Sequence, residues 1–211
     1  MNITFDIYLV GVGGQGILTI GEIIATAAFQ KGIPVNFYPI KGMAQRGGFV
    51  RAQLRMGRET VGPSIPEKGA DLIIATEVSE TLKAVRFIKP GGEGVGYNVI
   101  LFGFEWAPTA VMLGKAPYPA PEQVAEQVRA AGGAMLHIAP EGLPAYEGAP
   151  VPDNIYVLGV ALGQTRLGKV LDAVDVADVV KNRWKTGAER NLFAFEAGLK
   201  AHTRMGVTAT V

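Results

Sequence analysis

The sequence contains no cysteine, and this absence limits the chemistry that the chain can perform. Without a thiolate, its 211 residues can form no disulfide, no zinc finger and no cysteine-ligated iron–sulfur cluster. Histidine is scarce too, and His137 and His202 show no recognisable metal-ligand spacing. We therefore assign no metal site and no catalytic residue to this chain, and we expect any redox chemistry to take place on another chain.

Charged residues are also few, at 18% of the chain, and 20 basic residues against 19 acidic ones leave a net charge of +1. This balance argues against nucleic acid as a partner. No apolar run reaches the roughly 20 residues of a membrane span, and the first ten residues lack the basic start of a signal peptide. We expect a cytoplasmic protein. A mean hydropathy of +0.23 with so few charges predicts self-association of the isolated chain.

The length and the hydrophobic pattern predict one α/β domain over residues 1–211. Strands are expected at 3–10, 33–38, 49–56, 70–76, 95–102 and 134–138, and helices at 17–30, 77–88, 121–131, 153–167, 172–185 and 188–203. The 70–76 segment is almost continuously apolar, as expected for a central parallel strand. Eight of the 13 prolines fall between 108 and 152, so this stretch is expected to be mostly loop.

A glycine-rich loop follows the first expected strand. Gly11, Gly13 and Gly16 fit the pattern G-x-G-x-x-G between a strand and a helix, where free amides and the helix dipole can face an anion. The alternative is that these glycines only allow the strand and the helix to pack closely. The expected second strand has Asn36 and no acid to hold a ribose, which disfavours NAD, and the loop lacks the Lys-Ser/Thr pair of an ATPase.

Three ordered motifs carry a family resemblance: GVGGQGILTIGEIIATAAFQKG at 11–32, KGMAQRGGFVRAQLRMG at 41–57 and ADLIIATEVSETLKAVRFIKPGG at 70–92. They resemble the small, gamma-type subunit of 2-oxoacid:ferredoxin oxidoreductases. The GMAQRGG wording at 42–48 looks most like the beta subunit of indolepyruvate ferredoxin oxidoreductase. NIYVLGVALG at 154–163 and the residues around Asn191 extend the match over most of the chain.

The resemblance implies a three-layer α/β/α fold with a mostly parallel, mixed sheet, a glycine loop after the first strand and a helical C-terminal third. It implies a complex that oxidatively decarboxylates a 2-oxoacid, such as indolepyruvate, on thiamine diphosphate. Electrons would pass through iron–sulfur clusters to ferredoxin, and coenzyme A would be the cosubstrate that leaves as an acyl-CoA. Both cofactors would sit on a large partner subunit, so this chain would be an oxidoreductase subunit that is inactive alone.

Candidate site residues follow from the glycine loop and the motifs. A cofactor is expected to contact Gly11, Gly13, Gly14, Gln15 and Gly16, and a substrate or partner subunit is expected to contact Gln45, Arg46, Gly47, Gly48 and Asn191. An arginine flanked by glycines can clamp a carboxylate or phosphate, although it can equally form a surface ion pair. Core packing or capping is the alternative for Asn191.

Other groups have weaker support. Arg51 and Arg55 share an expected strand face, where they could extend a basic patch or line a polar surface. Glu22 and Glu77 are the carboxylates nearest the expected ligand-binding edge, and solvated positions are the alternative. Two rival functions stay open: a stand-alone nucleotide- or anion-binding regulator that uses the Gly11–Gly16 loop, and a scaffold whose glycine loop packs on a partner.

Overall fold

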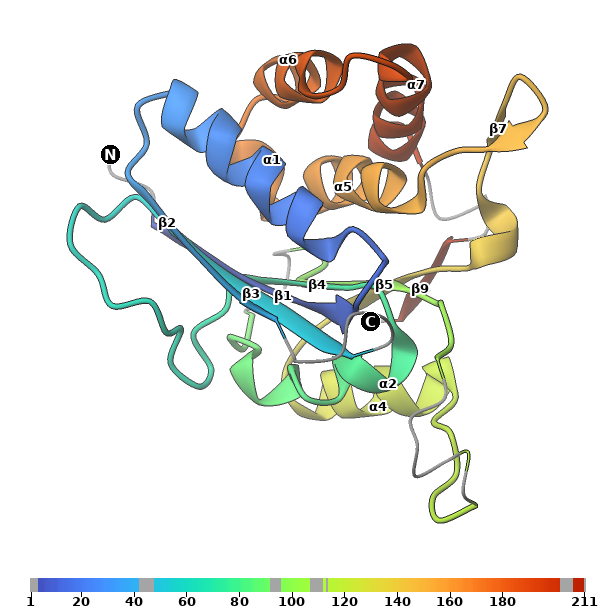
Figure 1. Ribbon diagram of the computed structural model, residues 1–211. Coiled ribbons are helices and arrows are strands. Elements are labelled where there is room, and N and C mark those ends of the chain that lie inside the picture. Colours follow the sequence, from blue (N-terminus) through green and yellow to red (C-terminus); the bar gives the residue numbers. More distant parts are fainter. Residues whose placement is uncertain are drawn as a thin grey trace.

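A mixed seven-stranded sheet forms the centre of the molecule (Figure 1). The computed structural model describes residues 4–41, 48–91, 96–106, 112, 114–201 and 207–210. Along the sheet the strands are β2 (Val35–Lys41), β3 (Phe49–Met56), β1 (Phe5–Val12), β4 (Leu72–Ala75), β5 (Val99–Phe102), β6 (Met135–Ile138) and β9 (Val207–Thr210). β1, β4, β5 and β6 are parallel neighbours, whereas β3 and β9 pair antiparallel with theirs.

Helices cover both faces of this sheet (Figure 1). One face carries α1 (Ile17–Gln30), α5 (Asp153–Gln164), α6 (Ala173–Arg183) and α7 (Ala188–Leu199); the other carries α2 (Val78–Thr81) and α4 (Pro121–Ala130). A small hairpin of β7 (Ala145–Tyr146) and β8 (Ala149–Pro150) stands apart from the main sheet. The three-layer α/β/α architecture with a helical C-terminal third confirms the expected fold class.

The strands bury their side chains in two hydrophobic clusters, one on each face. In β4, Leu72 and Ile74 belong to the cluster on the α1 face, whereas Ile73 and Ala75 belong to the cluster on the α2 face. Such burial on both sides explains the continuous apolar run at this point of the sequence. In β3, the alternation was predicted correctly, and Val50, Ala52, Leu54 and Met56 are all buried on the α1 face.

Small residues let α5 and α7 approach closely over the α1 face. A Cβ added at Gly159 would lie 2.1 Å from the Phe195 carbonyl oxygen, and one added at Gly198 would lie 2.1 Å from the Tyr156 carbonyl oxygen. No side chain fits such a gap without separating the helices. The two glycines therefore fix the distance between α5 and α7, and Phe195 and Tyr156 are buried beside them.

Several boundaries differ from the sequence prediction. The helix expected over 77–88 ends at Thr81 and is followed by a 3₁₀ turn, η1 (Val85–Phe87). The amides of Leu82, Lys83 and Ala84 bond to carbonyls three residues back, which tightens the chain into 3₁₀ geometry after Thr81. β1 runs on to Val12, α5 stops at Gln164 before η3 (Arg166–Lys169), and α7 stops at Leu199. The β7–β8 hairpin and β9 were not predicted.

Candidate functional site

The carboxyl ends of β1 and β4 lie side by side, and the glycine loop starts there. In open α/β sheets, ligands bind outside this edge of the parallel strands. The loop runs from the end of β1 at Val12 to the start of α1 at Ile17. Gly14 and Gly16 have φ angles of 103° and 66°, in the left-handed region that favours glycine. The predicted strand, tight turn and helix are therefore present in that order.

Gln15 is bonded within the chain. Its side-chain oxygen accepts from the Val12 amide at 3.0 Å and from the Thr76 hydroxyl at 3.0 Å. Its side-chain nitrogen donates to the Thr76 carbonyl at 2.7 Å. The side chain thus ties the loop to the residue that follows β4. The sequence pattern predicted Gln15 as a cofactor contact and did not indicate this internal role.

The second motif contacts the glycine loop through Gly48. The Gly13 amide donates to the Gly48 carbonyl at 2.8 Å, so the residue that precedes β3 lies against the loop. Sequence reasoning had proposed both residues as contacts of a ligand or a partner, and the structure brings them together. Gln45, Arg46 and Gly47 lie outside the described residues.

Two glycines of the loop are also required by packing. A Cβ at Gly11 would lie 2.1 Å from the Thr76 hydroxyl oxygen, and one at Gly16 would lie 2.4 Å from the Asn154 side-chain nitrogen. Asn154, in the first turn of α5, donates to the Gly16 carbonyl at 3.4 Å. The packing alternative therefore accounts for small residues at both positions. Packing does not explain the glycine at position 14, because a Cβ there would meet no atom within 4 Å.

Glu77 is a buried carboxylate at the same edge. Its exposed fraction is 0%, so the solvated alternative is wrong for this residue. It caps α2 by accepting from the Glu80 amide at 2.6 Å, and it also accepts from the Ser79 hydroxyl, from the Trp106 amide at 3.2 Å and from the Tyr118 hydroxyl. Burial and the adjacent Glu77 raise the pKa of Tyr118, which stays a neutral donor.

These bonds attach the segment after β5 to the end of β4. The Trp106 ring is 47% exposed and stacks against Phe104, with 6.5 Å between ring centroids. Glu77 therefore positions an exposed aromatic side chain next to the loop edge. The capping of α2 offered a sequence signal, since Glu77 directly precedes an expected helix, but the contacts with Trp106 and Tyr118 depend on the tertiary fold. Glu22, by contrast, forms an ion pair with Arg183 at the surface.

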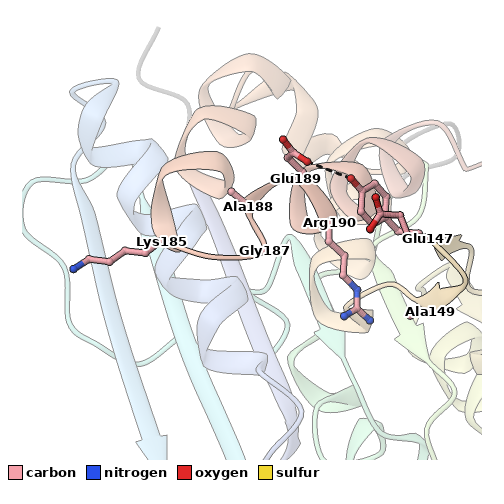
Figure 2. Close-up of a pocket in the computed structure, with 8 residues that line it drawn as sticks. Glu147, Ala149, Lys185, Gly187, Ala188, Glu189 and Arg190 are labelled. Carbon is pink, nitrogen blue, oxygen red and sulfur yellow. Dashed lines mark hydrogen bonds between the residues drawn. The ribbon is translucent and has the colours of Figure 1, made fainter.

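Asn191 belongs to a different part of the molecule. Its side-chain nitrogen donates to the Gly187 carbonyl at 2.9 Å, within the first turn of α7, and among the described residues no side chain caps the start of this helix. Gly187 lines a cavity of about 530 Å³ between the β7–β8 hairpin and the start of α7. Figure 2 shows that Arg190 points toward the hairpin, where it donates to the Pro150 carbonyl, whereas Lys185 points away. Tyr146 donates to Glu189 at 3.4 Å across this cavity.

Arg55 forms an ion pair with a buried carboxylate inside the protein. It contacts both carboxylate oxygens of Asp6, at 3.2 and 3.1 Å, and Arg58 adds a third contact at 2.7 Å. Asp6 is only 3% exposed, so these cations compensate a buried charge. Among the described residues, no three His, Asp or Glu side chains are placed to hold a metal ion. Within the same residues, no helix is both long enough and apolar enough to cross a bilayer.

Comparison with known proteins identifies the family. A family model described as pyruvate ferredoxin/flavodoxin oxidoreductase matches residues 6–201. The chain belongs to this family. It is 34% identical to the indolepyruvate oxidoreductase subunit IorB of Pyrococcus horikoshii, over 95% of this chain and 97% of that one. This likeness confirms the resemblance on which the sequence analysis relied.

Solved structures share the fold. The pyruvate oxidoreductase subunit PORC of Thermotoga maritima is 18% identical, with a TM-score of 0.67 and 99% of each chain covered. The 2-oxoglutarate:ferredoxin oxidoreductase of Magnetococcus marinus, solved with 2-oxoglutarate, coenzyme A and succinyl-CoA bound, is 19% identical with a TM-score of 0.53. That match covers 92% of this chain and 30% of the other. The family fold therefore occurs both as a separate chain and within a longer one.

Proposed function

We propose that this chain is the non-cluster subunit of a 2-oxoacid:ferredoxin oxidoreductase that acts on indolepyruvate or a related arylpyruvate. The complex decarboxylates the 2-oxoacid oxidatively, transfers the acyl group to coenzyme A and passes the electrons to ferredoxin. The observation that carries this proposal is the 34% identity to an indolepyruvate oxidoreductase subunit over almost the full length of both chains.

The lack of suitable ligand residues in this chain supports a location of the redox cofactors on a partner. The sequence has no cysteine to ligate an iron–sulfur cluster, so its residues do not fit such a group. No acidic motif for the metal of thiamine diphosphate was recognised in the sequence either. We therefore assign both cofactors to a large partner subunit and expect this chain to be inactive alone. Ferredoxin would meet the complex through that subunit.

The edge formed by the glycine loop and Gly48 is the proposed contact with coenzyme A or with the partner subunit. The start of α1 lies there, and helix amides favour anionic groups such as the phosphates of coenzyme A. Gly14 leaves its neighbourhood open, so a ligand or a partner backbone can approach it closely. Because Gly13 and Gln15 are bonded within the chain, they position this edge.

Reconstitution tests the proposal. The chain is co-expressed with its large partner subunit, and reduction of ferredoxin or a viologen dye is measured with indolepyruvate, phenylpyruvate, pyruvate and 2-oxoglutarate, each with and without coenzyme A. We expect activity only in the complex, dependence on coenzyme A, and the highest kcat/KM for an arylpyruvate.

Each alternative predicts a different result. If pyruvate or 2-oxoglutarate gives the highest kcat/KM, the assignment of an arylpyruvate is wrong. If the isolated chain reduces the dye, the inactivity of the single subunit is wrong. If the chain forms no complex and instead binds a nucleotide tightly, it is the stand-alone regulator that the glycine loop alone would suggest.

A further inference from the structure

A second cavity, of about 380 Å³, lies on the α2 face of the sheet. It is lined by Tyr8 of β1, by Phe49 and Arg51 of β3, by Leu82 and Lys83 between α2 and η1, and by Arg86 of η1. Three of these six side chains are cationic and none is acidic. The function proposed above makes no use of this cavity.

Arg51 is the most unusual of these side chains. Its Nε atom is buried, and within the part of the chain that the structure describes it has no hydrogen-bond partner. Its Nη1 atom makes one long contact with the Tyr8 hydroxyl, at 3.4 Å. A buried guanidinium donor without an acceptor is costly, and acceptor oxygens from a ligand would remove that cost. Arg51 therefore has unused capacity for an anion.

Two cationic side chains lie close to the aromatic ring of Phe49. The Lys83 Nζ atom lies 4.6 Å from the ring centroid, and the Arg51 Cζ atom lies 5.9 Å from it. Both distances are within the range of cation–π attraction. The aromatic ring thus concentrates positive charge at the cavity wall and offers an apolar surface beside it.

The other two cations are only partly neutralised. Lys83 pairs with Glu80 at 2.7 Å, and Arg86 approaches Glu67 at 3.8 Å. The side chains of Lys83 and Arg86 are 55% and 62% exposed, so both are accessible to a ligand, and solvent screens the Arg86–Glu67 pair because Glu67 is exposed too. Neither Glu80 nor Glu67 lines the cavity. Because the Glu80 side chain is only 9% exposed, Lys83 keeps this pair and offers its third N–H donor to a ligand.

We propose that this cavity binds a phosphate group. A phosphate dianion has enough oxygens and charge to satisfy two arginines and a lysine together, whereas a single carboxylate provides two oxygens and one charge. The phosphate can be free or carried by a nucleotide, in which case the Phe49 ring provides a surface for the base. The inference does not rest on the proposed oxidoreductase function, because it uses only the residues of this cavity.

Titration of the full chain at constant ionic strength tests the inference. Inorganic phosphate, pyrophosphate and ADP are titrated separately by calorimetry, with acetate as the carboxylate probe. We expect saturable binding of phosphate and at least about a tenfold weaker affinity in Arg51→Gln, because a charge-assisted hydrogen bond is lost. Lys185→Gln, which removes an equal charge from the other cavity, should leave the affinity unchanged.

Two further variants and the comparison of ligands complete the test. Lys83→Gln and Arg86→Gln change exposed side chains, so they report on the cavity even if Arg51→Gln fails to fold, and each should also weaken phosphate binding. Tighter binding of ADP than of inorganic phosphate would support a nucleotide as the source of the phosphate. The inference is wrong if phosphate does not saturate, if acetate binds as tightly, or if the cavity variants match Lys185→Gln.

Discussion

The side chain of Gln15 joins the ends of two parallel strands by contacting Thr76. It donates to the Thr76 carbonyl at 2.7 Å and accepts from the Thr76 hydroxyl at 3.0 Å, while it also accepts from the Val12 amide. The glycine loop is therefore held in place by hydrogen bonds of the protein itself. A site formed in this way is preorganised before any ligand or partner arrives.

Removal of this side chain should weaken the fold. In Gln15→Ala the Val12 amide and the Thr76 carbonyl lose partners, and an unsatisfied buried group costs about 1–3 kcal/mol. We expect the free energy of unfolding, measured in urea, to fall by about that amount. Gln30→Ala, at the exposed end of α1, is the matched control and should change it little. Equal effects of the two substitutions would show that the hydrogen bonds of Gln15 do not stabilise the loop.

Gly16 and Gly32 allow a second paired test. Both have left-handed backbones, with φ of 66° and 73°, which costs alanine about 1–2 kcal/mol. Only Gly16 faces another side chain, because an added Cβ would lie 2.4 Å from Asn154, whereas at Gly32 it would meet no atom within 4 Å. We expect Gly16→Ala to lower the melting temperature more than Gly32→Ala.

The additional loss of stability in Gly16→Ala, compared with Gly32→Ala, should depend on Asn154. In the Asn154→Ala background the two side-chain atoms within 3 Å of the added methyl group are removed and only the Cβ atom of residue 154 remains, at 3.3 Å, so most of the excess cost of Gly16→Ala over Gly32→Ala should disappear. An excess that is undiminished in this background would assign the effect of Gly16 to the backbone and not to the packing of α5 against the loop.

Local pattern predicted most of the scaffold and only part of the site. The alternation of Val50, Ala52, Leu54 and Met56 and the apolar run that becomes β4 report burial directly, so they were recognised correctly. β9 was missed because it gains its strand conformation by pairing with β6, far away in the sequence. After Thr81 the backbone amides bond to carbonyls three residues back, a change of hydrogen-bond pattern that periodicity does not report.

The same distinction applies to the site residues. The motifs predicted Gly13 as a cofactor contact and Gly48 as a contact of a substrate or partner, and neither pattern indicated that the two residues bond to each other. The long-range partner of Gln15 is 61 residues away, and those of Glu77 are 29 and 41 residues away. Only the fold brings such segments together, so these internal roles could not be read from spacing.

The stability of the fold should depend on a carboxylate at position 77. Its neighbours are hydrogen-bond donors, namely the amides of Glu80 and Trp106 and the hydroxyls of Ser79 and Tyr118. Glu77→Gln places an NH₂ group among these donors, which we expect to cost about 1–3 kcal/mol of unfolding free energy. Glu105→Gln, an exposed position in the same segment, is the control. If both variants unfold at the same urea concentration, Glu77 does not act as an acceptor for this network.

His137 should make stability depend on pH. Burial lowers its pKa, and the opposing effects of Glu122 and Glu141 are smaller. In the unfolded chain a histidine takes up a proton at about pH 6.5, whereas in the folded protein it stays neutral to a lower pH. The unfolded state therefore binds more protons below pH 6.5. Stability is full above that pH and falls as the pH decreases toward the folded pKa.

The measurement compares the wild type with His137→Gln in urea at about pH 7.5 and about pH 5.5. The wild type should lose more stability between these two conditions than the variant, because the variant has no group that titrates at this position. Subtracting the two curves cancels the carboxylates that both proteins share. Parallel curves would mean that the folded pKa of His137 is not lowered.

Arg46 is the residue of the second motif whose function is most open to test. It lies outside the described residues, but Gly48, two positions later, contacts Gly13 of the glycine loop. If Arg46 clamps a carboxylate or phosphate there, Arg46→Ala loses a charge-assisted hydrogen bond worth about 1.5–3 kcal/mol. In the reconstituted complex we expect about a ten- to hundredfold fall in kcat/KM for coenzyme A or the 2-oxoacid.

The controls separate this role from a surface ion pair. A surface pair is worth at most about 1 kcal/mol of stability, so its loss would lower the melting temperature slightly and leave turnover nearly unchanged. Arg166→Ala, at an exposed position in η3, measures that background. Arg46→Lys keeps the charge but loses the planar fork of the guanidinium, so it should recover only part of the activity if the contact is bidentate. Wild-type kinetics and assembly in Arg46→Ala would place Arg46 on the surface and remove it from the site.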